Sequence, residues 1–63
     1  MKLNNFLSYV GSDIIAKDGC KYYVIEISER DNGSLLFVCN ADDGEDHYFD
    51  YIEIDWKATA NLR

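Results

Sequence analysis

Three glycines, each preceded by aspartate or asparagine, divide most of this chain into short segments. Dipeptides such as Asp18-Gly19, Asn32-Gly33 and Asp43-Gly44 are typical of tight turns, because glycine tolerates a positive φ and the preceding side chain bonds to nearby backbone. The segments between them are rich in β-branched and aromatic residues. This spacing predicts consecutive hairpins, and Asp18-Gly19 is expected to form a type I′ turn.

Four or five antiparallel strands are expected, from segments at residues 14–16, 20–28, 35–41 and 46–56. Alternation divides the second segment between two faces, with Tyr23, Ile25 and Ile27 on one and Tyr22, Val24 and Glu26 on the other. The third segment is almost wholly apolar, so it is expected to be central and covered on both faces.

The last segment is expected to supply much of the core. Its inward parity consists of Tyr48, Asp50, Ile52, Ile54 and Trp56. An aspartate on that parity indicates a bulge or bend near it. We expect the two isoleucines and the tryptophan to anchor the core against residues of the N-terminal helix.

That helix is predicted over about residues 3–10. Leu3, Phe6, Leu7 and Val10 follow the i, i+3, i+4, i+7 spacing of one helical face. Two turns of helix are unstable alone, so the apolar face is expected to pack on the sheet, chiefly through Phe6 and Leu7.

The predicted fold is mainly β: a short N-terminal helix, a strongly bent four- or five-stranded antiparallel sheet over about residues 13–56, and a short tail over 57–63. Strands this short favour an SH3-like or Sm-like partial barrel. A sheet with one helix packed on it is the competing arrangement.

The layout resembles that of the Sm-like family. Phe6-Leu7 precede Gly11, then come Asp18-Gly19 and Asp31-Asn32 before an apolar strand, so the resemblance covers residues 5 to about 55. It implies an Sm-like barrel and, with it, assembly into a homo-oligomer.

Size and composition limit the chemistry. The 63 residues make a single domain, residues 1–63. Cys20, Cys39 and His47 are the only cysteines and histidine, and their spacing does not suit a structural zinc site. We expect two free thiols and a cytoplasmic protein, because neither a secretory leader nor an apolar run of the ~20 residues that span a bilayer is recognisable.

No catalytic motif is recognisable. Ser12, Ser28 and Ser34 lie at strand or turn ends, and His47 is the only base that titrates near neutral pH. A pocket of the ~300 Å³ that small-molecule sites use is not expected in so short a chain. The run from Asp42 to His47 fails the EF-hand pattern, because placing Gly44 at the glycine position puts Cys39 and Ala41 where ligands belong. We therefore expect a protein that is not an enzyme, with no metal and no cofactor.

Charge is distributed unevenly along the chain. Residues 1–30 carry four basic and four acidic side chains, whereas residues 31–56 carry eight acidic side chains and no lysine or arginine. Nucleic acids and anionic membranes attract lysine and arginine, so neither is expected as a direct partner of this chain, whose formal net charge is −6. A negative half steers toward a protein partner with a basic surface.

Within that half, alternation places Phe49 and Tyr51 on one face with Glu53 and Asp55. Because aromatic residues are enriched at interface cores, this face and the acidic turn before it form the predicted binding site. Its residues are Asp42, Asp43, Glu45, Asp46, Phe49, Asp50, Tyr51, Glu53 and Asp55. The alternative is that the acids only keep the protein soluble and the aromatics cover a core.

The predicted function is a small regulator or inhibitor, of a size common in phages and mobile elements, that docks on a basic protein surface or imitates nucleic acid. The alternative is an Sm-like or SH3-like assembly module whose open strand edges build a homo-oligomer. The mass in solution separates the two, because a sharp hexamer or heptamer favours the second.

Overall fold

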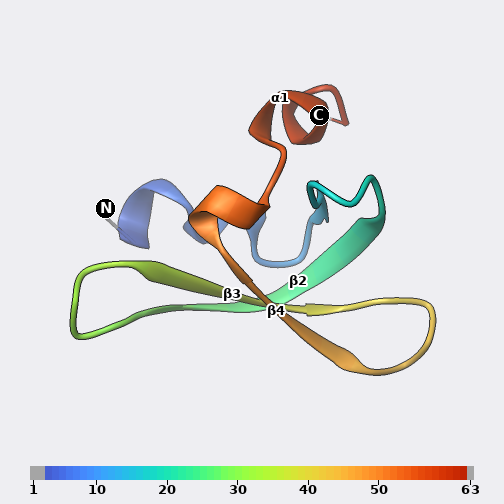
Figure 1. Ribbon diagram of the computed structural model, residues 1–63. Helices are drawn as coiled ribbons and strands as arrows, with labels where there is room; N and C mark the ends of the chain where they lie inside the picture. The colour runs from blue at the N-terminus through green and yellow to red at the C-terminus, as the bar shows by residue number, and fades with distance from the viewer. Residues whose placement is uncertain (1–2, 63) are drawn as a thin grey trace.

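The computed structural model describes residues 3–62, which form one bent sheet with helical turns on one side of it (Figure 1). Four antiparallel strands pair in sequence order: β1 (Asp13–Ile15), β2 (Lys21–Glu29), β3 (Leu35–Asn40) and β4 (Asp46–Asp50). The helical segments are η1 (Leu3–Asn5), η2 (Leu7–Tyr9), η3 (Tyr51–Glu53) and α1 (Trp56–Ala60). The mainly β class and the central place of the apolar strand β3 are confirmed, and the sheet is open.

The three expected turns share one construction. In each, the glycine N–H donates to the carbonyl three residues earlier, at 2.9 to 3.0 Å. The side chains of Asp18, Asn32 and Asp43 accept the backbone N–H two residues ahead, at 2.8, 3.0 and 2.9 Å. Only glycines have a positive φ within residues 3–62. A type I′ turn needs two such residues, so that expectation for Asp18-Gly19 is wrong, and the turn fits a three-residue hairpin loop closed by glycine.

A bulge in β2 changes the expected alternation. The register with β3 shifts between Val24 and Glu26, which leaves Ile25 as the extra residue. Val24 and Ile27, three residues apart, are therefore both buried, while Ile25 is 40% exposed. The predicted common face for Tyr23, Ile25 and Ile27 is wrong for this reason.

The N-terminal segment forms two 3-10 turns instead of the expected amphipathic helix. The N–H of Phe6 donates to the Leu3 carbonyl and that of Tyr9 to the Phe6 carbonyl, both at 2.9 Å. With three residues per turn, Leu3, Phe6 and Tyr9 face the core, and Leu7 and Val10 are 45% and 42% exposed. So short a segment has little helical stability of its own, so the aromatic packing decides its geometry.

The last strand is shorter than expected. β4 ends at Asp50, where a bend was expected. The backbone N–H of Asp50 donates a hydrogen bond to the Glu53 carboxylate at 2.8 Å. Tyr48 is 60% exposed and, like Asp50, lies on the side of the sheet away from the core, and a 3-10 turn follows, so the inward parity predicted from Tyr48 to Trp56 is wrong. Ile54 is 1% exposed and belongs to the core, but Ile52 is 72% exposed.

The chain then returns to β1. Ala16 and Ile54 form an isolated antiparallel bridge, and the N–H of Asp55 donates to the Ile15 carbonyl at 2.8 Å. The fully buried Thr59 of α1 accepts the N–H of Ile15 on its hydroxyl at 2.9 Å. These contacts tie the C-terminal segment to the first strand.

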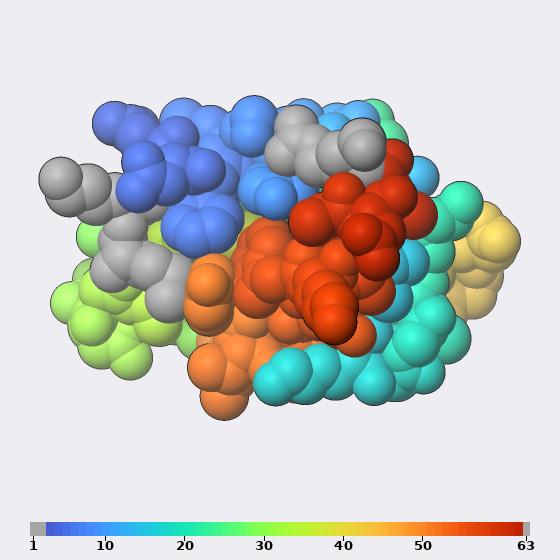
Figure 2. Space-filling model, turned by 90° about the horizontal axis from the view of Figure 1, so that it is seen from above, coloured from blue at the N-terminus to red at the C-terminus, as the bar shows by residue number. Residues whose placement is uncertain are grey.

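An aromatic cluster fills the space between the helical segments and the sheet. The Phe6 ring lies 5.5 Å from Trp56, 5.6 Å from Tyr51 and 6.2 Å from Phe37. The Trp56 indole N–H donates to the Tyr51 carbonyl at 3.1 Å. Viewed from the side of the helical segments, the N-terminal and C-terminal segments lie against one another (Figure 2). Phe6 and Trp56 therefore pack on the core as expected, whereas Leu7 does not.

Cys20 is exposed and Cys39 is buried, and both are free thiols, as expected. Within residues 3–62 every helical segment is too short to cross a bilayer.

Candidate binding surface: the outer face of the sheet and the β3–β4 turn

Within residues 3–62, one face of the sheet has no helical segment over it, so the cover expected on both faces of β3 is wrong (Figure 1). Phe37 and Cys39 of β3 point into the core, so Val38 between them points to the opposite side. We call that side the outer face, and the strand register assigns its members. They are Asp13, Ile15, Lys21, Tyr23, Glu26, Ser28, Leu36, Val38, Asn40, Asp46, Tyr48 and Asp50, together with the exposed bulge residue Ile25, which has no partner in the register.

Cross-strand pairing arranges these side chains in rows. The first row crosses all four strands and consists of Asp13, Tyr23, Asn40 and Asp46. The second row consists of Glu26, Val38 and Tyr48. Three interstrand spacings make the first row about 14 Å long. The first row therefore has a carboxylate at each end. Tyr23, which is 48% exposed, lies near the middle of this row, and Tyr48, which is 60% exposed, lies in the second row.

The β3–β4 turn continues this surface with further acids. Asp42, Glu45 and Asp46 are exposed and take part in no ion pair or side-chain hydrogen bond within residues 3–62. Asp43 differs, because it accepts the N–H of Glu45 at 2.9 Å and lies 3.1 Å from His47 Nε2. The backbone N–H, and then the histidine, hold the pKa of Asp43 below its usual value.

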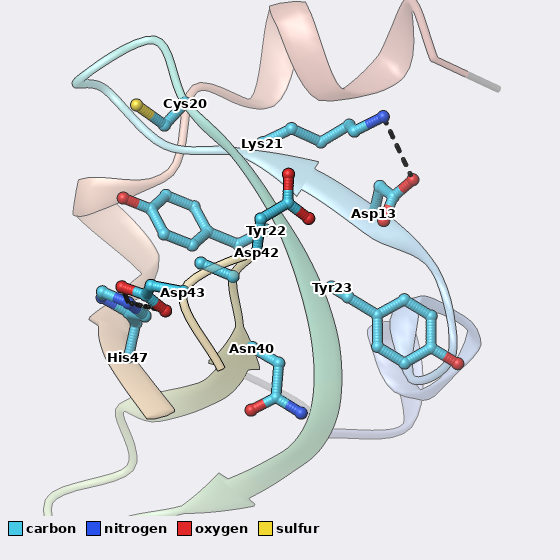
Figure 3. Close-up of a pocket in the computed structure, with 10 residues that line it drawn as sticks. Asp13, Cys20, Lys21, Tyr22, Tyr23, Asn40, Asp42, Asp43 and His47 are labelled. Atoms are coloured by element: carbon cyan, nitrogen blue, oxygen red, sulfur yellow. Dashed lines mark hydrogen bonds and ion pairs between the residues drawn. The ribbon is translucent and has the colours of Figure 1, made fainter. Parts of the chain in front are cut away.

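A hollow of about 490 Å³ lies between this turn and the start of β2 (Figure 3). Its lining consists of Asp13, Cys20, Lys21, Tyr22, Tyr23, Asn40, Ala41, Asp42, Asp43 and His47. Figure 3 shows Tyr22 and Tyr23 on opposite sides of β2. The expectation that so short a chain lacks such a space was wrong, because the β3–β4 turn stands beside β2 and leaves an open hollow between them.

The lining of the hollow is suited to cations. Tyr22 is 8% exposed, and its hydroxyl donates to Asp18 at 2.9 Å. That hydrogen bond, together with burial, raises the pKa of Tyr22 to about 12, so the phenol stays neutral. The carboxylates of the lining outnumber its one lysine, Lys21, which lies 4.0 Å from Asp13. The space is open to solvent and can accept a positively charged side chain.

Five acids of the predicted site lie along β4 and the turn before it. Asp42, Asp43, Glu45 and Asp46 come together at one end of the sheet. Asp50 lies at the other end of β4, where Arg30 of the β2–β3 turn forms an ion pair with it. The cation comes from the first half of the chain, so the acidic half is less uniformly negative in space than in sequence.

The other four predicted residues do not form the expected acidic, aromatic face. Phe49 points to the core side of β4, with its ring 4.7 Å from that of Tyr22, and Tyr51 packs on the core. Glu53 lies in η3, and Asp55 is the N-cap of α1, accepting the N–H of Ala58 at 3.0 Å. Phe49 faces the core because of its position in β4, and the strand ends before it could align Tyr51, Glu53 and Asp55.

Sequence reasoning missed the outer-face residues Asp13, Tyr23, Asn40 and Tyr48. The alternation of Asp46, Tyr48 and Asp50 is visible in the sequence and could have placed Tyr48 beside acids. The positions of the other three depend on strand register and on the bulge.

Among residues 3–62, histidine, cysteine and acidic side chains do not gather in threes as a metal site requires. Comparison of the chain with known protein families, with curated proteins and with solved structures finds no match.

Proposed function

We propose that this chain is a small, non-enzymatic binding protein that docks on a basic surface of a protein partner, through the β3–β4 turn and the adjoining end of the outer face. The observation that supports this most is the group Asp42, Glu45 and Asp46, exposed together and without an ion pair in the described residues. Carboxylates gathered at one end of a molecule 29 Å long attract basic surfaces and speed association.

A regulatory or inhibitory role follows from the same charge. Basic surfaces on proteins commonly bind phosphate backbones, which the carboxylates of this turn would repel and could replace. A small acidic protein seated there blocks access of nucleic acid without binding nucleic acid itself.

We infer further that the Ala16–Ile54 bridge closes the sheet as a partial SH3-like barrel. The 3-10 turn η3 before Ile54 and the return of the chain to β1 support this arrangement.

The homo-oligomeric alternative has less support. Antiparallel self-pairing of the open β4 edge, centred on Tyr48, would place Asp46 of one copy opposite Asp50 of the other, and like charges directly opposite are destabilising.

The test compares two matched double variants. Asp42→Asn with Glu45→Gln removes two charges from the β3–β4 turn. Glu29→Gln with Asp31→Asn removes two from the opposite end of the sheet, where both side chains are exposed and unpaired within residues 3–62 (Figure 1). Neither pair contacts the core, so both proteins should fold, as far-ultraviolet circular dichroism would check.

The partner is captured from an extract of the native host with the tagged parent protein, and its association rate is measured for each variant. We expect the first variant to associate several-fold more slowly, on the order of 3- to 10-fold at low salt, and the second to match the parent. The difference should shrink as the Debye length falls from ~10 Å at 0.1 M to ~3 Å at 1 M salt. Equal rates for all three proteins at both salt concentrations would contradict the proposed function.

A further inference from the structure

We propose that the outer face is the docking surface for a short basic segment of a partner protein, with an arginine or lysine on each side of an apolar or aromatic residue. This proposal rests on the proposed function. It adds that the outer face is the contact surface and that a short basic segment of the partner is the part that binds there.

The first support is the exposed apolar material at the centre of the face. Tyr23, Ile25 and Tyr48 are 48%, 40% and 60% exposed, and they surround Val38, which is 8% exposed. The helical turns and α1 all cover the other side of the sheet. Within residues 3–62, the outer face is therefore an apolar and aromatic surface over which no helical segment packs, and only the Tyr23 hydroxyl, at the β1 edge, lies close to Gly11.

The second support is the arrangement of charge around that centre. Asp13 and Asp46 end the first row, about 14 Å apart by strand spacing. Glu26 lies in the second row beside Val38. An extended segment places its residues i and i+4 about 13 Å apart. Two basic side chains at those positions can each reach one row end, while residue i+2 lies over Tyr23 and Asn40 at the middle of the first row, beside Val38 of the second row.

The local cations leave these carboxylates available. Lys21 lies 4.0 Å from Asp13, with 62% of its side chain exposed, so this pair is weak and displaceable. Arg30 pairs with Asp50 at the far end of β4. No lysine or arginine lies within 4 Å of Asp46 or Glu26 in the described residues. An arginine of the partner can also stack on Tyr23 or Tyr48 through a cation–π contact.

A second copy of this chain does not suit the same face. The outer face measures about 14 Å across the strands and, from Asn40 to Leu36 of β3, about 13 Å along them, roughly 180 Å². A stable interface between two proteins buries about 800 Å² on each partner. Two outer faces in contact would also bring Asp13, Glu26 and Asp46 of both copies together, which adds repulsion.

The experiment uses the full chain, labelled with ¹⁵N, and three synthetic peptides. The first is Arg-Ser-Leu-Ser-Arg, the second replaces both arginines by glutamate, and the third replaces the leucine by serine. Backbone amide shifts are followed during titration with each peptide, for the parent and for two variants. Tyr48→Ser alters the outer face, and Ile52→Ser is the matched control, because Ile52 is 72% exposed but lies in η3, outside the outer face.

We expect the first peptide to shift amides of β2, β3 and β4 around Val38. The dissociation constant should rise at least 5-fold with Tyr48→Ser, at least 5-fold when the leucine is missing, and not at all with Ile52→Ser. The glutamate peptide should give no shifts at the outer face.

Other outcomes separate this proposal from the proposed function. If both arginine peptides bind equally and shift only the β3–β4 turn, the docking surface is wrong and the acidic binding function survives. Equal binding of the glutamate peptide would overturn the charge argument for both. If amides around Val38 shift on concentrating the protein alone, the occupant is a second copy and the proposal is wrong.

Discussion

Replacement of Thr59 by valine is expected to weaken the contact that ties α1 to the first strand. The Thr59 hydroxyl accepts the N–H of Ile15 at 2.9 Å and lies 3.4 Å from the carbonyl of the same residue. Thr59 is fully buried. Valine preserves its size and branching but has no hydroxyl, so the Ile15 N–H would lose its partner where water has little access.

The size of the effect follows from that lost hydrogen bond. A buried N–H without a partner costs about 1–3 kcal/mol, and the partial exposure of Ile15 places the expected loss near about 1–2 kcal/mol. Domains of this size have total stabilities of about 3–9 kcal/mol. The loss is therefore a large share, and the melting temperature should fall by about 5–15 °C.

Urea unfolding followed by far-ultraviolet circular dichroism measures the loss. Thr59→Ser is the matched control, because it keeps the hydroxyl and removes only a methyl group, worth about 0.8 kcal/mol. A valine variant as stable as the parent, or more stable than the serine variant, would refute the view that this hydroxyl holds α1 to β1.

Three further predictions concern single side chains. Trp56→Ala should reduce the free energy of unfolding by about 2–4 kcal/mol, somewhat below the range for fully buried aromatics because Trp56 is half-buried; an unchanged urea midpoint would show that the ring does not support the core. Burial raises the pKa of Cys39 from 9.0 to about 11, so a thiol reagent at pH 8 should modify one thiol per chain, Cys20, until urea is added. For the same reason, stability should fall as the pH rises from about 9 to about 11, because the unfolded chain releases the Cys39 proton first, and a Cys39→Ala variant should lose that part of the slope. Asp43 has a lowered pKa, so its contribution to stability is present above pH ~4 and is lost as the pH falls through the lowered value; Asp43→Asn should flatten this acid limb, and an unchanged pH profile would contradict the assigned hydrogen bonds.

The acidic end of the candidate surface was predicted from sequence because its residues are neighbours in the chain. Asp42, Asp43, Glu45 and Asp46 belong to one turn, and any hairpin there presents them together. The pairing of Asp50 with Arg30 was not foreseen, since the two residues are twenty positions apart and meet only through the β3–β4 register. Tyr23 was grouped with Ile27 on one face, and the bulge at Ile25, which depends on the β2–β3 register, places the two on opposite faces.

The amino-acid sequence by itself determined the three hairpin turns, because a turn depends on the φ of one glycine and on one Asp or Asn side chain bonding two residues ahead. It also determined that β3 is central, since few other segments are as continuously apolar. Only the tertiary structure decided the bulge at Ile25 and the end of β4 at Asp50. A strand keeps its alternation only while its neighbour's register and the core allow it, and both depend on residues far away in the chain. The tertiary structure also decided which face of the sheet carries no helical segment within residues 3–62, because the aromatic rings of the N-terminal and C-terminal segments pack together on the opposite face.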